Sequence, residues 1–313
     1  MPKPTAFDLL YCPLHAANVR YEETRLICER GHEIAVENGI PIFAEEPRLE
    51  PKALNMPPLP QRTAPAAVDG FVDDWIVNTN GNLYWHVRGC LPRYPIPHWP
   101  SANSDGEVLV DLGCSWGRWS IAAARAGFSV CGVDVHLDAL RAAKRVAREL
   151  GVSADFVCSD ISRLPFKPGS VDFVFSYSVL QHLEKPKAKQ VLNRIAFILR
   201  PGGMCLLQLP NAFGLVSICR QLRRCFREPP ASSFAMRYWT PRAITRAFRE
   251  AGFGRVDLSA EGFLVQNTQR EDLDLLSKLG AAAVLSSCAL RTAANSIPPL
   301  ARIADSLWIK AWK

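Results

Sequence analysis

The residues best placed to do chemistry follow a short apolar run near the middle of the chain. Asp111 lies at the end of that run, and Gly113 and Gly117 separate it from a helical stretch. A glycine in such a turn lets the backbone approach a ligand closely, and the first turn of a helix has free N–H groups that can donate to it. The motif predicts a ligand site made of Asp111, Gly113, Cys114, Ser115 and Gly117.

The spacing of these glycines argues against a dinucleotide as the ligand. A dinucleotide-binding turn has glycines at its first, third and sixth positions, which here hold Gly113, Ser115 and Arg118. The carboxylate of Asp111 would also repel a pyrophosphate, whereas it suits a cofactor that carries an ammonium group. S-adenosylmethionine carries an ammonium group and a sulfonium, so we expect it as the cofactor.

Two more acids end the next apolar runs. Asp134 lies 21 residues after Gly113, the spacing at which an acid accepts hydrogen bonds from ribose hydroxyls. Asp160 follows the third run, where its carboxylate could reach an adenine amino group. The predicted cofactor site includes these acids and the residues after them, Val135 and Ile161.

Alternating strands and helices must position these residues. Apolar runs predict buried parallel strands at 107–112, 129–134, 154–158, 171–176 and 203–209. Helical patterns lie at 117–126, 137–150, 185–199 and 241–251, with strands near 255–260 and 305–312. Such alternation implies right-handed crossovers. We expect an α/β protein with a Rossmann-like, open, mostly parallel sheet and helices on both faces.

Residues 107–209 resemble the core of the class I methyltransferases that use S-adenosylmethionine. The resemblance rests on six segments in the family's order: 111–117, 132–134, 159–160, 164–166, 171–174 and 199–203. It implies that the first motif lines the methionine part of the cofactor, that Asp134 holds the ribose and that Asp160 borders the adenine. The family's usual middle glycine is Ser115 here. The intact acids and glycines argue against a silent binding protein that kept the fold.

The fourth strand leads to the candidate residues of the acceptor side, at the sheet edge where ligands bind. Its end lacks the Asn/Asp-Pro-Pro-Tyr/Phe pattern of enzymes that methylate exocyclic amino groups of bases. It resembles the Ser-to-His stretch of small-molecule methyltransferases, including those of quinone synthesis. We expect Ser176 at the cofactor, His182 as a base or hydrogen-bond donor, and Tyr177 in the pocket wall. Alternatively, His182 caps or packs at a helix start and Tyr177 is a core aromatic.

An insertion at 210–240 is expected to form a lid over the substrate pocket. Leu215, Ile218, Leu222 and Phe226 make an apolar stripe, flanked by Arg220, Arg223, Arg224 and Arg227. The basic face could hold a phosphate-bearing substrate or an anionic membrane surface. The alternative is the solvated face of an ordinary packed helix, which is also our expectation for the basic face of the helix at 137–150.

Two Cys/His pairs near the N-terminus have the spacing of zinc knuckles. Cys12 and His15 form the first pair and Cys28 and His32 the second, and such ligands suit tetrahedral zinc. The segment resembles the short zinc ribbons of methyltransferase activators and of bacterial large-subunit rRNA guanine-N1 methyltransferases, which have Cys where this chain has His15. A ribbon without zinc, held by its small apolar core, is the alternative.

We expect three parts: a zinc-ribbon-like β module at 1–46, a linker and extension at 47–104, and a methyltransferase domain at 105–313. This domain includes the lid and a helical insertion at 270–300. The net charge of +7 is uneven: residues 1–50 hold 5 basic and 9 acidic residues (−4), which leaves 32 against 21 (+11) for the rest. Opposite charges favour docking of the module onto the domain.

We expect a cytoplasmic protein, because the first eight residues lack the pattern of a signal peptide. Three of the ten cysteines lie in predicted buried strands, which favours free thiols over disulfides. The expected reaction is methyl transfer from S-adenosylmethionine to a small-molecule, lipid or saccharide acceptor. An RNA methyltransferase that selects its substrate through the ribbon is the alternative. The basic domain supports RNA, whereas the acidic ribbon and the missing amine motif argue against it.

Overall fold

The computed structural model describes residues 6–22, 24–46, 67–230, 235–265 and 269–313. The chain divides into two compact units. The first unit comprises Met1–Thr79, Val87–Phe175 and Phe197–Gly203, and the second comprises Asn80–His86, Ser176–Ala196 and Met204–Lys313. Most of the proline-rich linker predicted after residue 46 lies outside the described residues. No helix in the described ranges is long and apolar enough to cross a bilayer.

The N-terminal module of the first unit is a small antiparallel sheet. A 3₁₀ turn, η1 (Ala6–Leu9), precedes β1 (Tyr11–Cys12), β2 (Ala17–Glu22), β3 (Arg25–Cys28), β4 (Glu33–Glu37) and β5 (Ile40–Ile42). Each strand pairs with the next in antiparallel register. Its small apolar core includes the buried side chains of Leu10, Leu26, Ile34 and Ile40. The module is therefore a five-stranded β unit with few core side chains.

This module contacts the parallel part of the first unit through backbone and charge. Ile42 of β5 pairs with Cys158, and Leu10 forms a bridge with Phe166. Glu37 and Glu45 form ion pairs with Arg141 and Arg163. The Lys144 ammonium donates to the Asn38 carbonyl over 2.6 Å. The basic helix face that we expected to be solvated thus holds part of the acidic module, as the opposite net charges favour.

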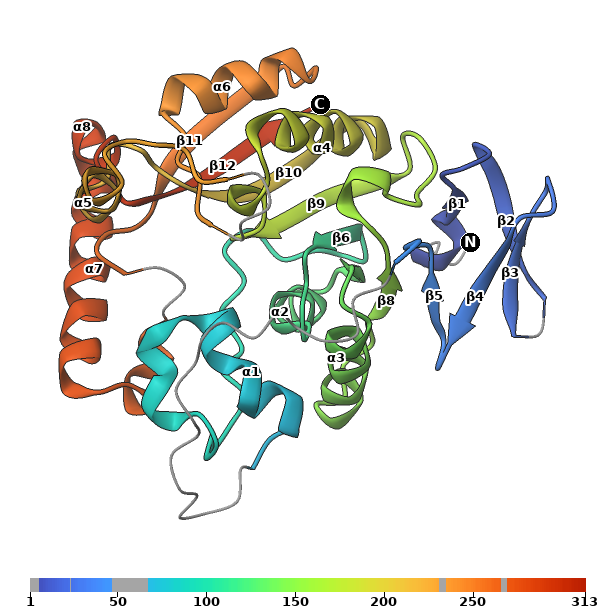
Figure 1. Cartoon of the computed structure of the whole chain (residues 1–313), viewed down its shortest axis with the longest axis horizontal. Helices are drawn as coiled ribbons and strands as arrows, with labels where there is room; N and C mark the ends of the chain where they lie inside the picture. The colour runs from blue at the N-terminus through green and yellow to red at the C-terminus, as the bar shows by residue number, and fades with distance from the viewer. Residues whose placement is uncertain (1–5, 23, 47–66, 231–234, 266–268) are drawn as a thin grey trace. The chain divides into compact units, whose positions relative to one another are not determined.

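The core of the first unit is a parallel sheet in the order β8-β7-β6-β9. Its strands are β6 (Val108–Leu112), β7 (Ser129–Asp134), β8 (Asp155–Cys158) and β9 (Val171–Tyr177). The helices α2 (Arg118–Arg125) and α3 (Leu137–Glu149) connect them, and η3 (Ile161–Arg163) follows β8. Every residue of β6 is buried. The predicted α/β fold and its strand positions are confirmed in this core (Figure 1).

Residues 67–104, which the sequence pattern did not place, contain α1 (Gly70–Asn80) and η2 (Asn82–Val87). In the first unit, the Trp99 ring packs against Phe128 and Phe175, at centroid distances of 5.3 and 4.9 Å. The Trp116 indole N–H donates to the Thr79 hydroxyl over 3.0 Å. These contacts hold the extension against β9 and against the residues that precede α2 and β7.

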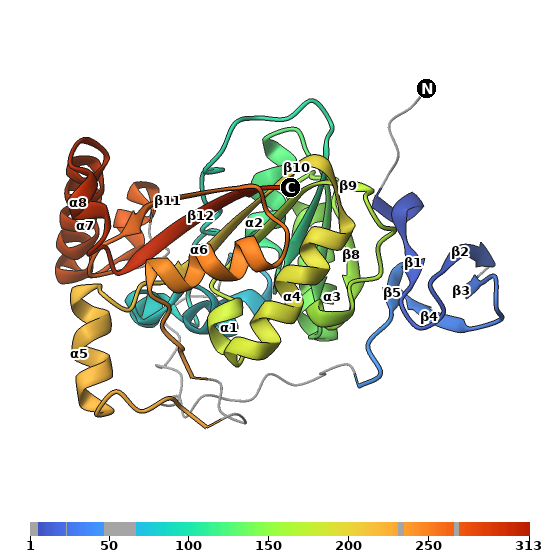
Figure 2. The same cartoon turned by 90° about the horizontal axis from the view of Figure 1, so that it is seen from above.

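The second unit contains an antiparallel sheet in which β12 (Ser306–Trp312) lies between β11 (Arg255–Gly262) and the part of β10 (Leu199–Pro210) that follows Gly203. β10 begins earlier than predicted, and its first residues accommodate Gly202 at a φ of 75°. The helices are α4 (Lys185–Ile198), α5 (Leu215–Arg223), α6 (Pro241–Glu250), α7 (Lys278–Ser296) and α8 (Pro298–Ala301). The unit also includes the 3₁₀ turns η4 (Leu180–His182) and η5 (Arg270–Leu275). Both views place α5 at the same end of this unit as α7 and α8 (Figure 2).

Candidate cofactor, acceptor and metal sites

A tight turn joins β6 to α2 and carries the predicted glycine motif. Gly113, Ser115 and Gly117 have φ values of 71°, 49° and 80°, all in the left-handed region that favours glycine. Ser115 thus takes the backbone conformation of the middle glycine that it replaces, at some cost in strain. The backbone N–H groups of Gly113 and Cys114 donate to the Val133 carbonyl over 2.7 and 3.1 Å, which holds the turn against β7.

Gly117 is confined by its neighbours as well as by its φ. A Cβ atom at this position would lie 3.1 Å from the Ala143 Cβ and 3.2 Å from the Phe156 ring. Gly117 is also the N-cap of α2, without a side chain to cap the helix. The first turn of α2 therefore keeps backbone N–H groups that a ligand can use.

Asp134 connects the end of β7 to this turn. One of its carboxylate oxygens accepts a hydrogen bond from the Ser115 N–H and the other from the His136 N–H, each over 2.9 Å. The side chain is partly exposed, as is the neighbouring Val135. Because a carboxylate oxygen can accept more than one hydrogen bond, these contacts leave acceptor capacity for ligand hydroxyls.

Asp160 lies at the end of β8, beside Asp134. The Ser159 N–H donates to the Asp134 carbonyl over 2.9 Å, and the Asp160 carboxylate accepts from the Ser162 N–H over 2.8 Å as the N-cap of η3. Asp160 and Ile161 are both partly exposed. The ends of β6, β7 and β8 thus bring together all the predicted cofactor residues except Ser176, which belongs to the second unit.

Two of the predicted cofactor residues are buried behind the turn. Asp111 is 2% exposed, and its carboxylate accepts a hydrogen bond from the Ser120 hydroxyl over 2.7 Å. Burial raises the pKa of Asp111 to about 7. Cys114 is 5% exposed and packs so close to Gly132 that a Cβ atom there would lie 2.8 Å from the Cys114 sulfur. Both side chains fix β6 against its neighbours.

The predicted acceptor-side residues follow β9 in the second unit. Ser176 and Tyr177 are buried, and the Tyr177 hydroxyl donates to the Glu261 carboxylate over 2.7 Å. The turn after β9 includes Ser178 at a φ of 62°. Glu261 was not predicted as a site residue, because nothing in β11 indicates that one of its acids faces a tyrosine far away in the sequence.

His182 ends the turn η4, three residues before the first residue of α4. Burial, together with the nearby positive charge of Arg237, lowers the pKa of its imidazole to about 4. The buried Arg237 guanidinium donates to the His182 carbonyl over 2.9 Å and to the Pro230 carbonyl over 2.8 Å. His182 is therefore neutral near pH 7, and Arg237, which sequence reasoning missed, fixes the backbone around it.

Three of the four predicted zinc ligands form one cluster in the N-terminal module, and the fourth, His32, contacts one of them. The Cys12 sulfur is 3.3 Å from His32 Nδ1, and the Cys28 sulfur is 3.3 Å from His15 Nδ1. The ligand atoms of Cys12, His15 and Cys28 all lie within 4.8 Å of one another. Tetrahedral bonds of about 2.0 Å to nitrogen and 2.3 Å to sulfur give a nitrogen-to-sulfur edge of about 3.5 Å, so the observed spacing fits this metal.

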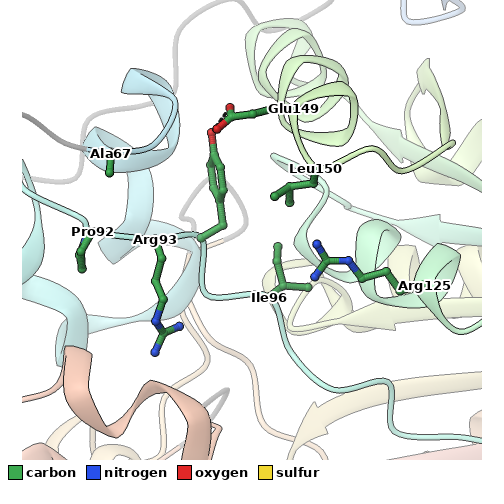
Figure 3. Close-up of a pocket in the computed structure, with 8 residues that line it drawn as sticks. Ala67, Pro92, Arg93, Ile96, Arg125, Glu149 and Leu150 are labelled. Atoms are coloured by element: carbon green, nitrogen blue, oxygen red, sulfur yellow. Dashed lines mark hydrogen bonds between the residues drawn. The ribbon is translucent and has the colours of Figure 1, made fainter.

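A separate open cavity of about 370 Å³ lies in the first unit (Figure 3). It is formed by the extension at 67–96 and by the C-terminal ends of α2 and α3. Two of the residues that line it are joined by a hydrogen bond: the Tyr94 hydroxyl donates to the Glu149 carboxylate over 2.6 Å. The cavity contains none of the predicted site residues, because the cofactor motif lies at the other, N-terminal end of α2.

Comparison with known proteins finds a family that matches the part of the chain containing the glycine turn and the strand ends. The sequence model of a family described as "Methyltransferase domain" matches residues 109–203. Residues 109–203 form a class I S-adenosylmethionine-dependent methyltransferase domain. The predicted cofactor class is confirmed with this domain.

Curated relatives of the methyltransferase domain include two ubiquinone biosynthesis O-methyltransferases. The protein of Cupriavidus pinatubonensis is 29% identical over 167 residues, which cover 50% of this chain and 64% of the relative. That of Idiomarina loihiensis is 36% identical over 107 residues, 34% of this chain and 43% of the relative. The chain thus spans less than two thirds of either relative.

Among solved structures, an S-adenosylmethionine-dependent methyltransferase from Methanosarcina mazei is similar over 71% of this chain and 99% of its own. Its sequence identity is 20% and its TM-score is 0.49.

Proposed function

We propose that the methyltransferase domain transfers a methyl group from S-adenosylmethionine to a hydroxyl group of a small-molecule acceptor. The observation that carries the proposal is the meeting of three strand ends at Asp134, whose carboxylate accepts from the Ser115 N–H after β6 and whose backbone carbonyl accepts from the Ser159 N–H after β8. The names of the curated relatives, which are O-methyltransferases of ubiquinone biosynthesis, support a small acceptor and a hydroxyl as its reacting group. Lipid and saccharide acceptors belong to the same proposed class.

The residues at the strand ends fit the cofactor in chemical type. Asp134 would hold the ribose hydroxyls, the region of Asp160 and Ile161 would border the adenine, and the turn at 113–117 would line the methionine part. The cofactor supplies an already activated methyl group, so the protein mainly has to supply proximity and orientation. The rigid attachment of the turn to β7 serves that purpose.

We propose His182 as the group that accepts the proton of the acceptor hydroxyl. A general base must be unprotonated at the working pH, and burial keeps His182 neutral above about pH 4. Arg237 would act as a positioning residue through the His182 carbonyl. Tyr177, held by Glu261, would form part of the pocket wall.

We also propose that Cys12, His15, Cys28 and His32 hold a structural zinc ion. The support is the donor set, two thiols and two imidazoles, with cross-distances of 3.3 Å. A closed set of four N and S ligands is typical of structural rather than catalytic zinc. The ion would stabilise a module whose apolar core is small.

A salt titration distinguishes a small acceptor from RNA. RNA held through its backbone binds less tightly as salt rises, with a slope set by the phosphates that are neutralised. We expect generic RNA to bind weakly and to be lost at moderate salt, since the acidic module contributes nothing. RNA binding that persists at high salt and depends on residues 1–46 would contradict the small-acceptor proposal.

A further inference from the structure

An exposed apolar stripe lies on α5 and the turn that follows it. The exposed fractions are 64% for Leu215, 56% for Leu222 and 62% for Phe226, and Phe213 just before the helix is 51% exposed. The expected lid would cover this stripe or bury it in a pocket. In the structure the stripe faces outward.

The helical part of the stripe is a defined surface, because its members share one side of α5. Leu215, Cys219 and Leu222 follow the i, i+4, i+7 spacing of one helix face, and Cys219 is also exposed. Phe226 follows in the turn after the helix, where its φ is 56°, and its side chain is also exposed. Leu215 and Leu222 therefore project from the same side of α5, about two helical turns apart.

The opposite side of α5 is fixed to the second unit. The Asp305 carboxylate accepts hydrogen bonds from the backbone N–H groups of Val216 and Ser217 over 2.7 and 3.1 Å. Ser217 is buried, and the Gln221 amide donates to the Ala212 carbonyl over 2.8 Å. The helix is thus anchored through its inner side, which leaves the apolar stripe on the outer side.

Arginines border the stripe. Residues 215–228 contain four arginines and one acid, Glu228, a balance of +3. Glu228 is itself paired with Lys185. Among the described residues, Arg223 and Arg227 make no ion pair with an acid. A partner that complements this face must carry negative charge for the arginines and an apolar region beneath that charge in which the leucines and phenylalanines can be buried.

We propose that this face, defined as Phe213, Leu215, Leu222, Phe226 and the arginines at 220, 223, 224 and 227, docks on an anionic lipid bilayer. An amphipathic helix with leucine and phenylalanine on one side and arginines beside them binds in the headgroup region, driven by apolar burial and by attraction to anionic lipids. A second copy of the chain would bring the same positive charge against itself, and RNA would gain nothing from burying leucines. The inference does not depend on the identity of the methyl acceptor.

The test is flotation of the full chain with vesicles, without cofactor or acceptor. Vesicles of phosphatidylcholine with about a third phosphatidylglycerol are compared with pure phosphatidylcholine. Each arginine near an anionic surface strengthens binding by about fivefold, so Arg223→Ala/Arg227→Ala should bind about 25-fold more weakly. Leu222→Ser/Phe226→Ser should lose at least about tenfold through lost apolar burial.

Matched variants elsewhere in the second unit control for charge and hydrophobicity. Arg242→Ala/Arg249→Ala removes two exposed arginines from α6, and Leu279→Ser removes a side chain that is 86% exposed on α7. Both controls should float like the original chain, and all variants should unfold at similar temperatures. The proposal would be overturned if the α5 variants floated as well as the original chain, or if the original chain did not float with anionic vesicles. A dimer of the original chain that is lost in Leu222→Ser/Phe226→Ser would instead assign the face to a second copy. RNA binding that persists at high salt and is lost in Arg223→Ala/Arg227→Ala would assign it to RNA.

Discussion

The carboxylate of Asp134 accepts a hydrogen bond of 2.9 Å from the backbone N–H of Ser115, whose φ is 49°. This contact fastens the end of β7 to the turn between β6 and α2. An acid predicted to bind the ribose thus also positions the turn predicted to line the methionine part. Removing one carboxylate should therefore affect both parts of the proposed cofactor site.

Replacing Asp134 by alanine should weaken cofactor binding. The Ser115 and His136 N–H groups would lose their acceptor, and a lost hydrogen-bonded polar group costs about 1–3 kcal/mol. Calorimetry should show a loss of about 5- to 150-fold in affinity for S-adenosylmethionine and its demethylated product. Asp257→Ala, which removes an acid paired with Arg255 in the second unit, is the control and should bind normally. Unchanged affinity in Asp134→Ala would refute the ribose assignment.

Replacing Gly117 by alanine should destabilise the first unit. The left-handed φ costs about 1–2 kcal/mol for a residue with a Cβ, and contacts of 3.1–3.2 Å with Ala143 and Phe156 add crowding. Denaturant titration should show a loss of about 2–4 kcal/mol, with weaker cofactor binding. Gly254→Ala is the matched control, because a Cβ there meets no atom within 4 Å. Equal stability of the two variants would contradict this account of the turn.

The pKa of His182 predicts how stability depends on pH. An ordinary histidine has a pKa near 6.5, and that of His182 in the folded chain is about 4. Between these values the unfolded chain binds more protons than the folded chain, so this contribution to stability is complete above pH 6.5 and is lost as pH falls toward 4. The loss is at most about 3 kcal/mol, and smaller because the side chain is partly exposed. Denaturant titrations of the original chain and His182→Gln at several pH values should show a flatter dependence for the variant. Parallel curves would contradict the low pKa.

Zinc at the N-terminal module can be measured directly. Elemental analysis should find about one zinc ion per chain, since Cys12, His15 and Cys28 are already gathered and His32 contacts Cys12. Cys28→Ser should lose the metal and destabilise the module, because structural zinc contributes folding free energy. Cys90→Ser, outside the module and partly exposed, should keep both. Zinc-free protein whose stability is insensitive to chelators would refute the metal.

The sequence was most informative where function depends on local pattern. The turn from Gly113 to Gly117 and the acids at the ends of β7 and β8 were all predictable, because strand ends and glycine turns have local signals. The pairing of Tyr177 with Glu261 was not predictable, since β11 lies far along the chain and its partners depend on the tertiary fold. The same holds for Arg237, whose buried contacts with backbone carbonyls have no sequence signature.

The sequence pattern also could not determine whether the apolar side chains from Leu215 to Phe226 are exposed. The spacing from Leu215 to Phe226 predicted an apolar stripe, but not whether other elements cover it. The anchoring of the inner side of α5 by Asp305 decides the matter, and Asp305 comes from the segment before β12. Residues 67–104 were unpredictable for a related reason, because their aromatic side chains, such as Trp99, are placed by α2 and the sheet.

The most direct test of the central claim is transfer of an isotopically labelled methyl group by the full-length chain. Labelled S-adenosylmethionine is incubated with hydroxylated aromatic small molecules, with a lipid extract and, separately, with total RNA. We predict label in the small-molecule or lipid fraction, strongly reduced in His182→Ala, and little label in RNA. Label found in RNA and absent from the small-molecule and lipid fractions would contradict the account.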